Sequence, residues 1–131
     1  MWQLEKEFTF EAAHRLPYHD GKCARLHGHS YRMKIIIAAS MLQESGPKTA
    51  MVQDFSEIKA VVKPLIDQYL DHHYLNDTLG TDTTTAEFIA RWVYDQVKPA
   101  LPLLQGVLIY ETCTSACLYS LGDALPIGGG L

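Results

Sequence analysis

Two stretches near the start of the chain alternate with a period of two, and this pattern constrains the fold more than any other feature. In Glu5–His14 one face would carry Phe8, Phe10, Ala12 and His14. In the second stretch, which runs from His27 to about Ala39, the shared face would carry His27, His29, Tyr31, Met33, Ile35 and Ile37. A segment containing Pro17, Asp20 and Gly21 separates the two stretches and is typical of a loop. The sequence therefore predicts two long strands joined by a loop.

Two helices are expected next. Asp54 and Glu57 have the spacing of a capping box, and the apolar positions step by three and four residues at Phe55, Ile58, Val62, Leu65 and Tyr69. Pro64 interrupts this pattern and predicts a bend or an earlier end. Thr84, with Glu87 three residues later, predicts the cap of a second helix that ends at about Val97. Its buried stripe would be Phe88, Ile89, Trp92 and Val93.

The last part of the chain alternates again, over Val107–Thr112 and Ala116–Leu121. The order strand, strand, helix, helix, strand, strand predicts an α+β fold with a four-stranded antiparallel sheet. A chain of 131 residues suits one domain, which we place at residues 1–122, followed by a flexible tail at residues 123–131. Helices on one face would leave the other face and both sheet edges uncovered, so we expect assembly through the sheet.

Charge excludes some classes of partner and favours another. The net charge of -4 argues against a nucleic-acid partner, and the longest apolar run, Ile35–Ala39, is far too short to span a membrane. Between His14 and Lys34, however, the sequence contains five basic residues and only one acidic residue, so an anionic ligand is expected there. Three cysteines cannot all pair within one chain, which favours a reducing, cytoplasmic location.

Three histidines are placed to converge. His27 and His29 lie two residues apart on a predicted strand and so share a face, and His14 ends the first strand on a similar face. If the strands pair, three imidazoles meet at one end of the sheet, which is the ligand set of a catalytic zinc site. The alternative is that the His-x-His pair is ordinary surface or structural polarity.

Three other positions are candidates for chemistry. Cys23 lies in a loop beside cationic residues that favour a thiolate; it could be a base, a nucleophile, a fourth zinc ligand or an inert thiol. Asp71 and His72 could form a proton relay, or the histidine could simply lie against the last carbonyls of a helix. Glu111 ends an apolar strand face and could accept N–H donors from a heterocycle, or it could be a solvated strand-end residue.

Several motifs together resemble a known family over nearly the whole chain, from about Phe8 to Tyr119. These are FTFEAAHRLP, KCARLHGHSY, LDHHYLND, TTAEFIAR, DQVKPALPLL and ETCTSACLY. They are similar to the 6-pyruvoyltetrahydropterin synthase superfamily, and within it to the bacterial 6-carboxy-5,6,7,8-tetrahydropterin synthases of the QueD group. The spacing CARLHGH, with the cysteine four positions before the first histidine, carries the subgroup assignment.

The resemblance implies a role for each candidate residue. The zinc ligands would be His14, His27 and His29, the base would be Cys23, and the relay would be Asp71 with His72. Glu111 would anchor the pterin ring and could be counted with the relay, and Thr85 and Glu87 would line the pterin pocket. Two departures, Ala50 where relatives often have Gly and Thr84 where they often have Pro, would affect loop geometry.

The resemblance also implies a fold, an assembly and a reaction. The fold would be the tunnelling fold, in which three subunits close their sheets into a barrel and two trimers stack into a hexamer, with active sites at subunit contacts. The enzyme would be a zinc-dependent lyase of queuosine biosynthesis. It would convert 7,8-dihydroneopterin triphosphate to 6-carboxy-5,6,7,8-tetrahydropterin, acetaldehyde and triphosphate. The alternatives are a pyruvoyl-type synthase that keeps the side-chain carbons, a non-catalytic zinc-stabilised pterin-binding module and, with little support, a redox-sensing thiol protein.

Overall fold

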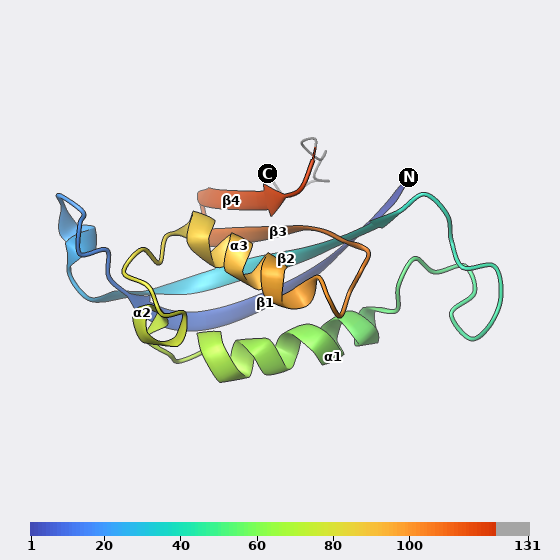
Figure 1. Ribbon diagram of the computed structural model, residues 1–131, viewed down its shortest axis with the longest axis horizontal. Coiled ribbons are helices and arrows are strands. Elements are labelled where there is room, and N and C mark those ends of the chain that lie inside the picture. Colours follow the sequence, from blue (N-terminus) through green and yellow to red (C-terminus); the bar gives the residue numbers. More distant parts are fainter. Residues whose placement is uncertain (123–131) are drawn as a thin grey trace.

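The computed structural model describes residues 1–122, and the expected tail at residues 123–131 lies outside the described residues. The elements run β1 (Trp2–His14), η1 (Lys22–Ala24), β2 (His27–Ala39), α1 (Phe55–Leu65), η2 (Ile66–Leu70), α2 (Leu75–Thr78), α3 (Ala86–Val97), β3 (Leu104–Thr112) and β4 (Ser115–Ser120). The expected order of strands and helices is confirmed (Figure 1). The short elements η1 and α2 were not expected, and β1 and β3 begin earlier than expected, at Trp2 and Leu104.

The four strands form one antiparallel sheet in the order β1-β2-β3-β4. β1 and β2 pair without a register shift along their whole length, from Trp2 opposite Ala39 to His14 opposite His27. This unbroken register matters for function, because it brings the end of β1 against the start of β2.

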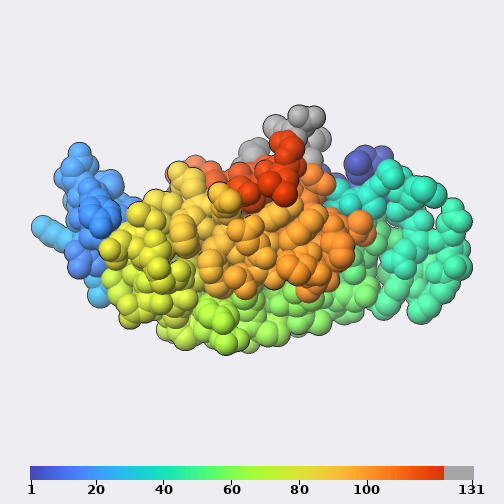
Figure 2. All heavy atoms as spheres, in the orientation of Figure 1, coloured from blue at the N-terminus to red at the C-terminus, as the bar shows by residue number. Residues whose placement is uncertain are grey.

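One face of the sheet is buried under the helices and carries the main core. Alternate residues of the strands, including Phe10, Tyr31 and Ile35, pack against the buried faces of α1 and α3. Figure 2 shows the atoms of α1 and α3 side by side on the surface turned to the viewer. The Phe10 and Tyr31 rings stack with their centroids 4.9 Å apart, and the Tyr31 ring also contacts the His29 ring, with centroids 5.4 Å apart.

The first helix follows its expected cap but not its whole expected stripe. Asp54 accepts from the Ser56 N–H and Glu57 reaches back to the Asp54 N–H, which confirms the capping box. The α-helix ends at Leu65, one residue after Pro64, and continues as a π-helical turn, η2. This wider turn places Ile66 and Leu70 in the core. The predicted buried stripe was wrong at its first position, because Phe55 lies in the first turn of α1 and is 49% exposed.

The predicted cap of the second helix was off by one residue. Thr85, not Thr84, accepts from the Phe88 N–H at 3.1 Å, and α3 begins at Ala86. The Thr84 hydroxyl is fully buried and donates to the Asn76 side chain, so it is not available to the helix. Ile89 and Val93 are buried as expected, whereas Phe88 and Trp92 are only partly buried.

The opposite face of the sheet has a different character. A small apolar group of Ile36, Leu108 and Tyr110 lies beside paired charges. Arg32 pairs with Glu7 at 3.1 Å and lies over the Tyr110 ring, and Lys34 pairs with Glu5 at 3.4 Å. β1 and β4 are the edge strands, and this face and these edges are the surfaces from which we expected assembly.

Among residues 1–122, none of the helices has both the length and the apolar character needed to cross a bilayer.

Candidate active site

Three imidazoles meet at one end of the sheet. The β1–β2 register sets His14 opposite His27, and His29 follows two residues later on the same face of β2. The ring centroids lie 4.5 Å apart for His14 and His27, 5.0 Å for His14 and His29, and 4.9 Å for His27 and His29. One nitrogen from each ring lies within 4.8 Å of the other two. The predicted convergence is therefore present.

Hydrogen bonds orient two of these rings. His14 Nδ1 lies 2.8 Å from the Thr84 carbonyl oxygen, and His27 Nδ1 lies 2.7 Å from the Arg25 carbonyl oxygen. Because a carbonyl only accepts, we assign the proton of each neutral ring to Nδ1, which leaves the lone pair on Nε2. The Nε2 atoms of His14 and His29 are buried and have no hydrogen-bond partner among the described residues.

Buried polar atoms without a partner call for an explanation. A bound metal ion supplies one, since imidazole nitrogens with this arrangement are metal ligands. Burial lowers the pKa of His14 and of His29, and this keeps both rings in the neutral form that can ligate. The residues present therefore fit a metal ion.

Cys23 and Glu111 line a hollow of about 490 Å³. Cys23 lies in η1 and is half-buried, whereas Glu111 comes from the end of β3, where its Oε1 lies 3.6 Å from His29 Nε2. Thr85 and Glu87, from the start of α3, form another part of the wall. The hollow thus brings together four of the predicted residues and adjoins the histidines through Glu111.

His72 lines a different hollow, and Asp71 precedes it directly after the end of η2. His72 Nδ1 lies 2.9 Å from Asp71 Oδ2, and the Glu11 N–H donates to Asp71 Oδ1 at 2.9 Å. This backbone donor, followed by the His72 ring, holds the Asp71 pKa below its usual range. His29 also lines this second hollow, but Cys23 does not. One chain therefore presents the expected relay without placing it in the hollow that holds Cys23.

The backbone at His72 is unusual. Its φ is 59°, in the left-handed region, where a residue with a β-carbon is strained by about 1–2 kcal/mol. The His72 N–H donates to the Glu11 carbonyl, and the neighbouring Ala13 N–H donates to the His73 carbonyl. Residues 71–73 therefore cover the outer edge of β1 at Glu11 and Ala13, and these hydrogen bonds hold His72 in its strained conformation.

Sequence reasoning missed two polar residues beside the histidines. Thr84 is fully buried and Asn76 is 9% exposed, and both are hydrogen-bonded near His14. The only sign of this contact in the sequence was the hydroxyl group of Thr84, and the sequence pattern assigned that residue to the cap of the second helix. Tyr31 was expected on the histidine face, but its buried hydroxyl without a described partner was not foreseen.

The five basic residues between His14 and Lys34 divide into two groups. Arg32 and Lys34 are paired with Glu7 and Glu5 on the far face of the sheet. The remaining three, Arg15, Lys22 and Arg25, lie in or next to the η1 loop that carries Cys23, and all three are exposed. Only this second group lies near the histidines.

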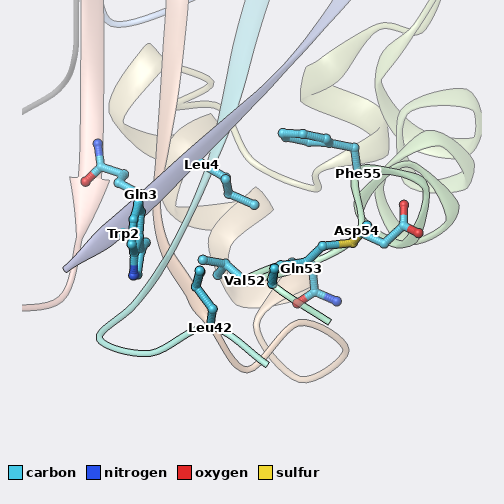
Figure 3. A pocket seen from close by; sticks show the side chains of 10 residues that line it. Trp2, Gln3, Leu4, Leu42, Val52, Gln53, Asp54 and Phe55 are labelled. Carbon is cyan, nitrogen blue, oxygen red and sulfur yellow. The ribbon is translucent and has the colours of Figure 1, made fainter. Parts of the chain in front are cut away.

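A further hollow lies at the opposite end of β1. It is lined mainly by apolar side chains from the start of β1 and from the segment before α1, including Trp2, Leu4, Leu42 and Val52 (Figure 3). His14 ends the same strand that Trp2 begins, so this hollow is separate from the histidines. It contains no histidine or cysteine and is not a candidate for the chemistry.

Comparisons with known proteins agree with this geometry. The family model described as 6-pyruvoyl tetrahydropterin synthase matches residues 3–121. A curated relative from Synechocystis named 6-carboxy-5,6,7,8-tetrahydropterin synthase is 51% identical over 120 residues, which cover 91% of this chain and 93% of the relative. A relative of the same name from Bacillus subtilis is 32% identical, over 99% of this chain and 89% of its own length.

A solved structure gives the same result for the fold. The 6-pyruvoyl tetrahydropterin synthase of Caenorhabditis elegans superposes with a TM-score of 0.77 at 27% sequence identity. The superposition covers 92% of this chain and 96% of the other. The four-stranded sheet with its helices is therefore an architecture already seen in a synthase of this kind.

Proposed function

We propose that this chain, which belongs to the 6-pyruvoyl tetrahydropterin synthase family, is a zinc-dependent 6-carboxy-5,6,7,8-tetrahydropterin synthase. Its substrate would be 7,8-dihydroneopterin triphosphate, and its products would be 6-carboxy-5,6,7,8-tetrahydropterin, acetaldehyde and triphosphate, as a step of queuosine biosynthesis. The observation that carries the proposal is the convergence of three imidazoles beside a hollow that contains a thiol and a carboxylate. Curated relatives matched over most of their length are named synthases, and the chain is accordingly an enzyme of the lyase class.

The metal would be held by His14, His27 and His29. Zinc bound by three imidazoles keeps a coordination position open and acts there as a Lewis acid toward oxygen atoms of a substrate. The protein contributes three imidazole rings, two of them oriented by carbonyl acceptors. We infer zinc from the ligand type, since imidazole alone also suits other transition metals.

Glu111 and Cys23 would both act on the pterin from the hollow that they line. A carboxylate accepts hydrogen bonds from adjacent N–H donors, so Glu111 would hold the amino-pyrimidine edge of the ring and fix its position. Cys23 as a thiolate would take a proton from the substrate side chain. Thr85 and Glu87 belong to the wall of the same hollow and would limit where the ring can lie.

Asp71 and His72 would supply the second acid/base group, and we propose that they do so for a neighbouring subunit. Residues 71–73 cover the outer edge of β1 at Glu11 and Ala13, so a strand from another copy can pair only with the earlier part of β1. In an antiparallel barrel that strand is β4, and its first residue, Ser115, would then lie near the partner's relay. Ser115 belongs to the hollow that holds Cys23.

This arrangement would place each active site at a subunit contact. We propose that three sheets close into one barrel and that two trimers form a hexamer, with residues 1–122 as the synthase domain of each subunit. Closing the barrel would satisfy the backbone groups of both edge strands. The three thiols are free in the structure. We also propose a cytoplasmic location, where the reducing environment would keep these thiols free.

The triphosphate would lie near the η1 loop. Arg15, Lys22 and Arg25 are exposed there, whereas Arg32 and Lys34 are paired with carboxylates on the other face. We therefore narrow the expected anion-binding group to the first three residues.

The decisive experiment is product analysis. Purified zinc-loaded protein is incubated with 7,8-dihydroneopterin triphosphate, and triphosphate and acetaldehyde are both quantified. Equal amounts of the two products are expected. Triphosphate without acetaldehyde would show a pyruvoyl-type synthase instead, and binding without either product would leave only a pterin-binding module.

The metal is tested in the same preparation. His27→Ala is expected to lose bound zinc and turnover together. His73→Ala is the matched control, because this ring contacts the Asp67 carbonyl and lies outside the three-histidine group, and it is expected to keep its zinc.

A further inference from the structure

We propose that Asn76 and Thr84 are positioning residues of the metal site, which together hold His14 with its Nε2 atom directed at the ion. The inference rests on the proposed function only in requiring that the three histidines bind a metal. No role for these two residues follows from the histidine pattern itself.

His14 is held differently from the other ligands. Its Nδ1 faces the Thr84 carbonyl at 2.8 Å and the Thr84 hydroxyl oxygen at 3.3 Å, and the ring is completely buried. Among residues 1–122, the hydrogen bond that orients the His27 ring goes to the carbonyl of Arg25, two residues away in the chain. The orientation of His14 therefore depends on a residue 70 positions away in the sequence.

Asn76 connects that distant residue to the backbone of β1. Its side-chain Nδ2 donates to the Arg15 carbonyl at 2.9 Å, and its Oδ1 accepts from the Arg15 N–H at 3.1 Å. The same Oδ1 accepts from the Thr84 hydroxyl at 2.9 Å. Asn76 thus clamps the residue that follows His14 and, at the same time, the residue that orients the His14 ring.

Every proton in this network has one consistent position. The Thr84 hydroxyl donates its only proton to Asn76, so its oxygen can only accept from His14 Nδ1–H. The Thr84 carbonyl also can only accept from that group. The network therefore selects the tautomer in which His14 Nε2 carries the lone pair, and hydrogen bonds to the non-ligating nitrogen commonly orient metal-bound histidines in this way.

The clamp also reaches the wall of the substrate hollow. Thr84 is followed directly by Thr85, which caps α3 and lines the hollow with Cys23. Fixing Thr84 to Asn76 therefore sets the position of a metal ligand and of the pocket wall with the same contact.

The test compares substitutions of nearly equal size at Thr84. Thr84→Val removes the hydroxyl and keeps the carbonyl that faces His14, whereas Thr84→Ser keeps both. The dissociation constant for Zn²⁺ is measured by competition with a chromophoric chelator on the full-length protein without any pterin. We expect Thr84→Val and Asn76→Ala to weaken Zn²⁺ binding by about 10–100-fold and Thr84→Ser to stay within about threefold of the wild type.

Thr78→Val is the matched control. Thr78 also donates its hydroxyl to a carbonyl, that of Tyr69, and lies on α2 with Asn76, but it does not contact a histidine of the group. Loss of this half-buried hydroxyl and its hydrogen bond should lower the thermal midpoint of the variant without changing Zn²⁺ affinity. If Thr84→Val destabilises the metal-free protein but binds Zn²⁺ as the wild type does, the hydroxyl is merely structural and the inference is wrong.

The two proposals fail in different ways. Wild-type protein that binds no Zn²⁺ would overturn the metal site and, with it, the positioning role. Wild-type binding with unchanged affinity in Thr84→Val and Asn76→Ala would overturn the positioning role alone.

Discussion

Ala50 illustrates how one residue can store strain without taking part in chemistry. Its φ is 67°, a conformation that favours glycine because a β-carbon there crowds the backbone. The sequence had marked this position as one where relatives often have Gly, but only the structure shows why. The loop before α1 therefore holds an alanine in a conformation that suits glycine better.

Ala50→Gly is expected to stabilise the fold by about 0.5–1 kcal/mol, since relief of the left-handed strain exceeds the extra entropy of glycine in the unfolded chain. Denaturant unfolding of the two proteins measures the difference. Gly46→Ala is the reverse control, because Gly46 has a φ of 87° with open space around it; it should destabilise by a similar amount. A less stable Ala50→Gly protein would mean that the Ala50 methyl group packs usefully in its hollow.

Cys23 is the residue at which the proposed chemistry is most directly testable. Cys23→Ala is expected to lower kcat by about 10²–10⁴-fold, the range for a lost proton-transfer group, and to leave bound zinc unchanged because the thiol is not one of the three converging ligands. Steady-state kinetics and metal analysis check the two parts.

Cys113→Ala provides the comparison for Cys23. Cys113 is an exposed free thiol outside the hollow that holds Cys23, and its removal should leave kcat unchanged. Normal turnover by Cys23→Ala would assign the base to another group, and loss of zinc in that variant would make the thiol a ligand.

At the scale of elements, periodicity predicted most of what the structure contains. The alternation in β1 and β2 predicted the shared face of His14, His27 and His29, and the antiparallel register then brought the rings together. Local patterns sufficed here because a strand fixes the side of each residue and a pair of strands fixes which ends meet.

Contacts between distant segments could not be predicted from local patterns. Thr84 has a helix-cap residue type and spacing, yet its hydroxyl bonds to Asn76 and the cap moves to Thr85. The placement of Cys23 and His72 in two different hollows depends in the same way on where η1 and η2 lie relative to the sheet. Residue types at a given spacing carried no information about either contact.

The start of α1 is stabilised in a pH-dependent manner. The Lys48 ammonium, with help from Ser56, holds the Asp54 pKa well below its usual range. A depressed pKa contributes stability that is present above the pKa of the unfolded chain, about 4, and is lost as the pH falls toward the folded value. The ion pair therefore supports the helix at neutral pH and stops doing so in acid.

Asp54→Asn keeps an oxygen that can cap the helix but removes the charge. We expect it to lower the urea midpoint at pH 6, and we expect the gap from the wild type to narrow at pH 3. Asp54→Ala, which removes the cap as well, should remain below Asp54→Asn at both pH values. A gap that does not change with pH would show that the charge contributes nothing and that only the cap matters.

At the scale of the whole molecule, a single chain holds its proposed catalytic groups at two separate places. Its hollow with Cys23 and Glu111 opens beside the start of β4, and its Asp71–His72 pair lies on the outer edge of β1. These are the two edge strands of the sheet. A ring of copies that joins β4 of one subunit to β1 of the next would therefore assemble one complete set of groups at each junction.

Mixing two inactive variants tests this arrangement. Cys23→Ala and His72→Ala should each be nearly inactive as pure oligomers. Co-expressed in equal amounts, they should recover activity, because a junction that takes Cys23 from one variant and His72 from the other is intact. Random assembly in a closed ring makes about a quarter of the junctions intact.

The control co-expresses Cys23→Ala with Glu111→Gln, whose altered residues line the same hollow of one subunit. A subunit that carries either change has a damaged hollow, so every junction is affected and no recovery is expected. Recovery in the first mixture alone would locate the relay on the neighbouring subunit. Activity that stays at background in the first mixture, with mixed oligomers verified by mass spectrometry, would instead require Cys23 and His72 to act within one chain.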